Sequence, residues 1–233
     1  MTRESRLVGP RAAVLALAVV AAACAGGARP EPEGPRPAGS PAAETADLEA
    51  LFRARRDSAR MRYTPADVRF MTGMIAHHAQ ALVMAGLVPE RSSNSSIRTL
   101  AARIINAQKD EIARMQQWLR GRGQPVPEVH IEGTTMMVHG AEHAMHMPGM
   151  LTPEQLRELE AARGVEFDRL FLKYMIQHHR GAISMVRELF ATDGAAQDED
   201  AFRLASDIRV DQDTEIARME LMLAALPVED GAP

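Results

Sequence analysis

The feature of this chain that most constrains its fold is a long word that occurs twice, with the two copies 101 residues apart. The first copy reads Asp67-x-x-Phe70-Met71-x-x-Met74-Ile75-x-His77-His78-x-x-Ala81-x-x-Met84, and the second reads Asp168-x-x-Phe171-Leu172-x-x-Met175-Ile176-x-His178-His179-x-x-Ala182-x-x-Met185. Within each copy the apolar residues recur three and four positions apart, which is the period of an amphipathic helix. Each copy therefore predicts one helix with a buried stripe, and the duplication predicts two similar halves.

A second repeated word predicts the partner helix in each half. Gln108-x-x-Glu111-Ile112-Ala113-Arg114-Met115 matches Gln212-x-x-Glu215-Ile216-Ala217-Arg218-Met219. We expect the first helical hairpin over residues 64–123, and a short accessory helix followed by the second hairpin over residues 152–227. Two similar hairpins bury their apolar stripes best against each other. The sequence thus predicts an all-α fold, a four-helix bundle made of two repeated hairpins, with another short accessory helix within residues 47–63.

The N-terminus has the layout of a secretory signal. Arginines precede an apolar run from Ala12 to Ala23, which is too short for a transmembrane helix, so we expect residues 1–23 to be a signal peptide. Cys24 follows three alanines, as in a bacterial lipoprotein signal, and we expect it to be lipidated. Lipidation would anchor the chain to a membrane on its extracytoplasmic side. Ordinary cleavage after Ala23 or Ala25 is the alternative, and it would leave a periplasmic or secreted protein.

Composition excludes several classes of function. Removal of residues 1–23 takes away three Arg and one Glu, which changes the net charge from -4 to -6, so nucleic acid is not an expected partner. Residues 24–46 are rich in Pro, Gly, Ala and Glu and predict a disordered tether. Because Cys24 is the only cysteine, the chain cannot form an internal disulfide or a multi-thiolate metal site. Imidazole, thioether and carboxylate remain as metal ligands.

The paired histidines are the strongest candidates for a metal site. Each residue of a helix turns about 100°, so neighbouring His77 and His78 diverge, and each pairs more naturally with Met74, three or four residues earlier. The predicted metal ligands of the two helices are Met74, His77, His78, Met84, Met175, His178, His179 and Met185. The alternative is that the methionines fill the core and the imidazoles form a buried polar network without metal.

Four carboxylates accompany these histidines in the two repeated words. Asp67, Glu111, Asp168 and Glu215 are expected either as direct metal ligands or as acceptors for the second N–H of the imidazoles. Their alternative roles are helix-terminus charges for the two aspartates and solvated faces for the two glutamates.

The connector between the hairpins, residues 124–151, is expected to be irregular because Gly and Pro interrupt any helical period. It is nevertheless rich in His and Met, and its predicted metal ligands are His139, His143, Met145, His146 and Met147. Thioether binds Cu(I) well and imidazole serves both oxidation states, so this mixture favours copper over zinc or iron. A polar connector without metal is the alternative. In the hairpins, methionine stands where a di-iron bundle would need glutamate, which argues against ferroxidase chemistry.

The doubled His-His word, together with Met147-Pro148-Gly149-Met150, resembles the bacterial domain-of-unknown-function family 305, which includes CopM-type extracytoplasmic copper-binding proteins. The resemblance covers about residues 64–226. It implies a ferritin-like helical bundle, a secreted or anchored location, and copper handling.

The leading functional hypothesis is therefore a copper-binding protein of the cell envelope that buffers copper, as Cu(I) or Cu(II), or delivers it to a copper-transfer protein. Two alternatives stay open: a redox enzyme with a metal inside the bundle, and an interaction module whose histidines bind no metal. The halves also differ, since Ala79-Gln80-Ala81 stands where the second half has Arg180-Gly181-Ala182. A cation near the second pair only predicts different metal affinities in the two halves.

Overall fold

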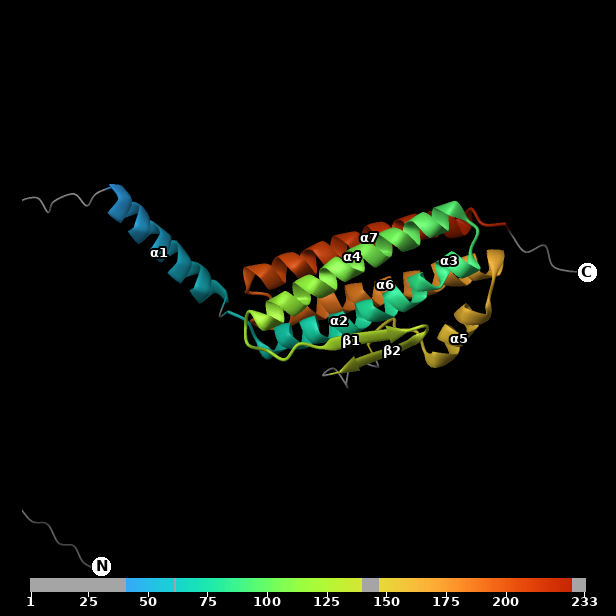
Figure 1. Ribbon diagram of the computed structural model, residues 1–233, viewed down its shortest axis with the longest axis horizontal. Coiled ribbons are helices and arrows are strands. Elements are labelled where there is room, and N and C mark those ends of the chain that lie inside the picture. Colours follow the sequence, from blue (N-terminus) through green and yellow to red (C-terminus); the bar gives the residue numbers. More distant parts are fainter. Residues whose placement is uncertain (1–40, 61, 140–146, 228–233) are drawn as a thin grey trace, which may run out of the picture. The chain divides into compact units, whose positions relative to one another are not determined.

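Four long helices form the body of the chain (Figure 1). The computed structural model describes residues 41–60, 62–139 and 147–227. The long helices are α2 (Pro65–Gly86), α4 (Ser95–Arg120), α6 (Gly164–Ala191) and α7 (Glu199–Ala224). Helix α2 lies beside α4 and α6, and α7 lies beside α6 and α4, so each helix has two neighbours in the bundle. The predicted all-α bundle of two helical hairpins is confirmed.

Side-chain caps mark where three of the four long helices begin, whereas α6 follows Arg163 without a side-chain cap. Thr64 accepts hydrogen bonds from the backbone N–H groups of Ala66 and Asp67, and Asp67 in turn accepts from the N–H of Thr64. Asn94 and Asp198 cap α4 and α7 in the same way. The short helices are α3 (Val88–Arg91), which links α2 to α4, and α5 (Pro153–Ala161), which Thr152 caps. Each cap contributes about 1 kcal/mol, which explains why the polar residues before each apolar stripe mark its start.

The aspartate that opens each copy of the first repeated word also joins one hairpin to the other. Asp67, at the start of α2, accepts a hydrogen bond of 2.7 Å from the backbone N–H of Ala196, between α6 and α7. Asp168, at the start of α6, is buried and hydrogen-bonded to the side chain of Ser92, between α3 and α4. Burial raises the pKa of Asp168, and the bond from Ser92 opposes that shift. The repeated aspartates therefore fasten each hairpin to the connection of its partner.

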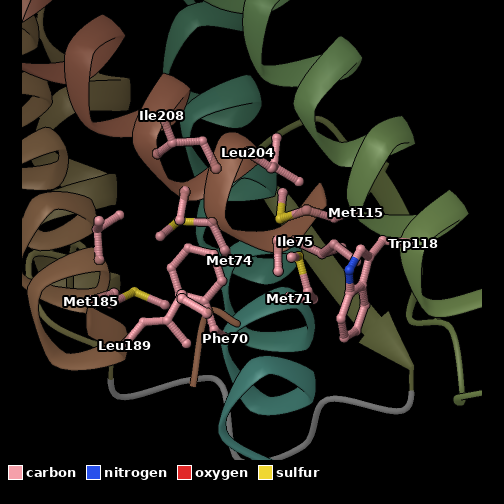
Figure 2. Close-up of a cluster of buried hydrophobic side chains, with 14 of the residues drawn as sticks. Phe70, Met71, Met74, Ile75, Met115, Trp118, Met185, Leu189, Leu204 and Ile208 are labelled. Atoms are coloured by element: carbon pink, nitrogen blue, oxygen red, sulfur yellow. The ribbon is translucent and has the colours of Figure 1, made fainter. Parts of the chain in front are cut away.

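The core consists of two apolar clusters, one toward each end of the bundle. Figure 2 shows the first, in which Phe70, Met74, Ile75, Met115, Met185, Leu189, Leu204 and Ile208 from all four helices meet. The second contains Met84, Leu100, Ile104, Phe167, Phe171, Met175 and Met219. By length and composition alone, the segment Pro65–Arg91 could span a membrane, but 78% of its apolar window is buried in the bundle. Packing in these clusters accounts for that apolarity.

Part of the connector that was predicted to be irregular forms a β-hairpin. Strand β1 (Glu128–Glu132) pairs antiparallel with β2 (Thr135–His139). Gly133 begins the two-residue turn with φ 59°, the backbone conformation that favours glycine at this place in a type II′ turn. Val129 and Val138, which lie opposite each other, pack against the bundle. The prediction was wrong here because strands of five residues are too short to show a clear period of two.

The last residues of the connector, from Met147 to Leu151, dock on α2 and α6. Gln80 accepts a hydrogen bond from the N–H of Leu151 at 2.7 Å and donates to its carbonyl at 3.1 Å. A Cβ on Gly181 would lie 1.9 Å from the carbonyl oxygen of Pro148, so only glycine permits this approach. Gln80 and Gly181 stand at one matched position of the repeat where the halves differ, and both hold the connector.

Helix α1 (Pro41–Arg60) corresponds to the accessory helix expected within residues 47–63. It begins inside the range predicted as a tether, where Pro41 at the first helical position and two following alanines favour a helix. Leu48, Leu51 and Phe52 are exposed. The signal peptide, Cys24 and most of the tether lie outside the described residues, as do the predicted ligands His143, Met145 and His146.

Alanine at Gly181 should destabilise the protein. The new Cβ would displace the Pro148 carbonyl, so we expect Gly181→Ala to lower the free energy of unfolding by about 1–3 kcal/mol in urea denaturation. Gly86→Ala is the matched control, because a Cβ there meets nothing within 4 Å, and it should leave stability unchanged or raise it slightly. Equal effects of the two substitutions would contradict the docking of the connector on α6.

Candidate metal centre

A layer of polar side chains separates the two apolar clusters. His77 and His78 of α2 and His178 and His179 of α6 are all 0% exposed. Helices α4 and α7 add a glutamine and a glutamate each, from the second repeated word. We call the eight residues the central layer: His77, His78, Gln108, Glu111, His178, His179, Gln212 and Glu215. The duplicated words of the sequence thus meet at one level of the bundle.

His78 and His179, which we call the outer histidines, each bind a glutamate on the other helix of their own hairpin. His78 Nε2 lies 2.8 Å from Glu111 Oε2, and His179 Nε2 lies 2.6 Å from Glu215 Oε2. A carboxylate accepts the Nε2–H of the ring and so fixes its tautomer and orientation. Of the two roles expected for Glu111 and Glu215, the geometry gives them the orienting one.

His77 and His178, which we call the inner histidines, lie against each other where the two hairpins meet. The ring centroids of His77 and His178 are 3.9 Å apart, with their planes at 40°. His178 Nε2 is 3.0 Å from the carbonyl oxygen of His77, and His77 Nε2 is 3.0 Å from that of Pro148. A carbonyl oxygen can only accept, so Nε2 carries the proton in both rings. The asymmetry between the halves therefore lies in Pro148, which the connector brings to His77.

Burial keeps the inner rings neutral. Loss of solvent, together with repulsion from His78, lowers the pKa of His77 to about 3, although the bond to Pro148 acts in the opposite direction. The pKa of His178 also falls well below its ordinary value, first because of burial and then because of His77. At neutral pH each inner ring is thus an imidazole with Nε2–H and a bare lone pair on Nδ1.

All four imidazoles leave that second nitrogen unused. In the part of the chain that the structure describes, Nδ1 of His77, His78, His178 and His179 is buried without a hydrogen-bond partner, and so is Oε1 of Gln108 and of Gln212. Each buried acceptor without a donor costs about 1–3 kcal/mol. Six polar atoms without a partner therefore lie in one layer, and an Nε2–H held by a protein acceptor is also the arrangement usual for metal-bound histidine.

The layer is not a closed cage for a hard metal ion. Over residues 41–60, 62–139 and 147–227, no three His, Cys, Asp or Glu side chains are already gathered around one point.

Two predicted ligands, Met147 from the connector and Met185 from the end of the second histidine word, lie close to Gly73. The sulfur of Met147 lies 3.0 Å, and the methyl carbon of Met185 3.4 Å, from the place where a Cβ on Gly73 would stand. Glycine at this position of α2 therefore makes room for two thioether side chains. His139, another predicted ligand, is exposed at the end of β2.

Other predicted ligands lie away from the imidazoles. Asp67 and Asp168 precede the first histidine of their word by ten residues, which is roughly 15 Å along a helix, and they bind the connections instead. Met74 and Met175 lie one turn from the layer but pack in the apolar clusters, as do Met84 and Met185 farther along the helices. The structure therefore brings the histidines and glutamates together and leaves the aspartates out.

Arg180 does not supply a cation to the second histidine pair. Its side chain is 64% exposed and binds Glu220 at 2.7 Å on the surface. The predicted difference in affinity between the halves thus loses its electrostatic basis, and Pro148 is the difference that reaches the layer.

Sequence reasoning missed Gln108 and Gln212 as members of the layer. Both open the second repeated word, three residues before the glutamate, and this spacing places them on the face of the glutamate. That signal was present in the sequence. The carbonyl of Pro148 and the space above Gly73 left no comparable signal, because both depend on how the connector docks.

The layer reaches solvent between α4 and α7. A groove lined by Leu100, Arg103, Ala107, Asp211, Thr214, Glu215 and Arg218 opens there. Burial raises the pKa of Asp211, and the nearby carboxylates of Glu111 and Glu215 raise it further. The groove therefore brings solvent to Glu215, the member of the central layer that lines it, with both carboxylates and arginines around it.

Acid should destabilise the protein through the inner histidines. In the unfolded chain these rings take up protons near pH 6.5, whereas folded His77 stays neutral down to about pH 3. The unfolded state then binds more protons, so the free energy of unfolding falls as the pH drops below about 6.5, by about 1.4 kcal/mol per pH unit for each such ring. Urea denaturation of metal-free protein between about pH 7.5 and about pH 4.5 measures this slope.

The variant His178→Leu should lose part of that slope. The control His130→Ala removes an exposed ring and should keep it. An identical slope in His178→Leu and the unaltered protein would show that the inner rings do not resist protonation.

Comparison with known proteins places the chain in a family. The model of DUF305, a domain of unknown function, matches residues 67–223, while no curated protein matches. A DUF305 fragment from Deinococcus radiodurans is 34% identical, with a TM-score of 0.58 over 70% of this chain and 99% of that one. A DUF305 protein of Streptomyces coelicolor, described as a candidate secreted protein, is 26% identical, with a TM-score of 0.59 over 72% and 98%. CopM in its Cu(II)-bound form is 29% identical, with a TM-score of 0.52 over 68% and 95%. This chain belongs to the DUF305 family.

Proposed function

We propose that this protein binds copper outside the cytoplasm and buffers or delivers it through histidine and methionine ligands. The observation that carries the proposal is the set of four buried imidazoles whose Nε2–H is anchored and whose Nδ1 has no partner among the described residues. A cation held by some of these nitrogens would remove the cost of burying bare acceptors.

The chemistry of the available donors favours copper. Neutral imidazole and thioether are ligands that Cu(I) accepts readily, whereas Mg²⁺ and Ca²⁺ prefer oxygen. Met147 and Met185 place thioethers beside Gly73, on the helix that carries His77. CopM, whose structures include Cu(I)-, Cu(II)- and silver-bound forms, shares the fold at 26–29% identity. Silver is a soft cation as well, so these bound forms agree with a site built for soft ions.

Two observations support the proposed location. Arg3, Arg6 and Arg11 with the apolar run up to Ala23 have the layout of a secretory signal, and Cys24 would anchor the mature chain through a lipid. The Streptomyces relative is described as a candidate secreted protein. We propose an anchored protein of the cell envelope that exchanges copper with a transfer protein.

A metal-free role for the central layer is the second candidate. One nitrogen of every imidazole already has a protein acceptor, so the layer also has the form of a polar network that fixes the register of the two hairpins. In that case the protein would be an interaction module, and copper would not change its stability.

Copper titration separates the two roles. We expect the mature chain to take Cu(I) from a competing chelator at micromolar copper. The combined substitution His78→Leu and His179→Leu should weaken binding by at least about tenfold, because it removes two imidazoles together with their anchoring by glutamate. Ser184→Ala, on the exposed side of α6, is the matched control and should bind as the unaltered protein does.

The melting temperature gives an independent result from the same samples. A ligand at about 100 times its dissociation constant stabilises the folded state by about 2.7 kcal/mol, so Cu(I) should raise the melting temperature. Failure to compete for copper, with an unchanged melting temperature, would favour the metal-free network. Continued oxygen consumption by the Cu(I) protein would instead identify a redox enzyme.

A further inference from the structure

The outer face of the β-hairpin carries a second group of metal-binding side chains. In the register of β1 and β2, Glu128 lies opposite His139, and His130 lies opposite Met137. Side chains two residues apart on a strand point to the same side, so all four share one face. This group is separate from the central layer, because the opposite face of the hairpin, with Val129 and Val138, is the one that packs on the bundle.

These side chains are open to solvent. The side chains of His130 and Glu128 are 60% and 77% exposed, and Met137 is 49% exposed. Packing therefore does not explain why two imidazoles, a thioether and a carboxylate stand together. A cross-strand contact between exposed rings contributes at most about 1 kcal/mol to the hairpin.

The spacing of the two rings suits a shared ion. The ring centroids of His130 and His139 are 5.7 Å apart, and the rings meet edge to face. A metal–nitrogen bond of about 2 Å would set two imidazoles on one ion with centroids about 6 Å apart at most. Glu128 Oε2 is 3.9 Å from His130 Nε2, so a small rotation of its exposed side chain brings the carboxylate to the same ion. No three such side chains are already gathered in the described residues, so these exposed side chains would turn toward the ion as it binds.

We propose that Glu128, His130 and His139 form a surface site for Cu(II), with Met137 as a weak additional ligand. The choice of copper rests on the function proposed above. Two imidazoles and a carboxylate are nitrogen and oxygen donors, and among the divalent first-row ions such donors bind Cu(II) most strongly. Water completes the coordination at an exposed site. The central layer differs, because it is buried.

Titration of the mature, full-length protein with Cu(II) tests this site, with electron paramagnetic resonance as the readout. We expect His130→Thr and His139→Thr each to weaken Cu(II) binding at the hairpin by at least about tenfold and to remove nitrogen couplings from its spectrum. Threonine suits a strand, so the hairpin should stay folded. Glu132→Gln, on the same face but beyond these ligands, is the matched control and should leave binding unchanged.

The double variant His78→Leu and His179→Leu keeps this experiment independent of the central layer. It should retain the hairpin Cu(II) signal even though it weakens Cu(I) binding. Unchanged Cu(II) affinity and spectra in both threonine variants would overturn the surface site and leave the buried one standing. Loss of Cu(II) binding in those variants, with no Cu(I) binding by the unaltered protein, would support the surface site and remove the proposed Cu(I) centre.

Discussion

The burial of four imidazoles at one level of a helical bundle is the constraint on which the rest of the structure depends. Each ring can be buried because a carboxylate or a carbonyl accepts its Nε2–H, and the inner rings of His77 and His178 stay neutral. The apolar clusters on either side supply the hydrophobic stabilisation that a polar layer cannot. The Nδ1 atoms, which have no partner among the described residues, are what this arrangement leaves over, and the proposed copper binding rests on them.

The two sequence repeats supply equivalent residues to the central layer, and the connector, which is not repeated, supplies one further contact. His78 with Glu111 and His179 with Glu215 are equivalent pairs in the two hairpins. The connector breaks the equivalence, because it occurs once and places the Pro148 carbonyl at His77. Gln80 and Gly181 occupy matching positions in the repeats, yet one holds the connector by hydrogen bonds and the other by leaving space. The matching helices α2 and α6 therefore contact the same connector in two different ways.

The sequence predicts the bundle well because its signals are local. The apolar period and the repeated words predict two helical hairpins over residues 64–123 and 152–227, and the four long helices lie within these ranges. The β-hairpin was missed because its strands are short. Asp67 was grouped with the histidines because it shares their repeated word, although ten residues of helix separate them by roughly 15 Å. The contact of Met147 with Gly73 depends on how the connector docks, which no local pattern encodes.

Nitrogen NMR of labelled histidine tests the central claim most directly. At pH 7 the metal-free protein should show His77 and His178 as neutral Nε2–H tautomers, and Cu(I) should shift Nδ1 of those central rings that bind it while Nε2 stays protonated. Inner rings that are charged or protonated on Nδ1 in the metal-free protein, or central rings that do not respond to Cu(I), would contradict the account of a buried layer prepared for a soft metal ion.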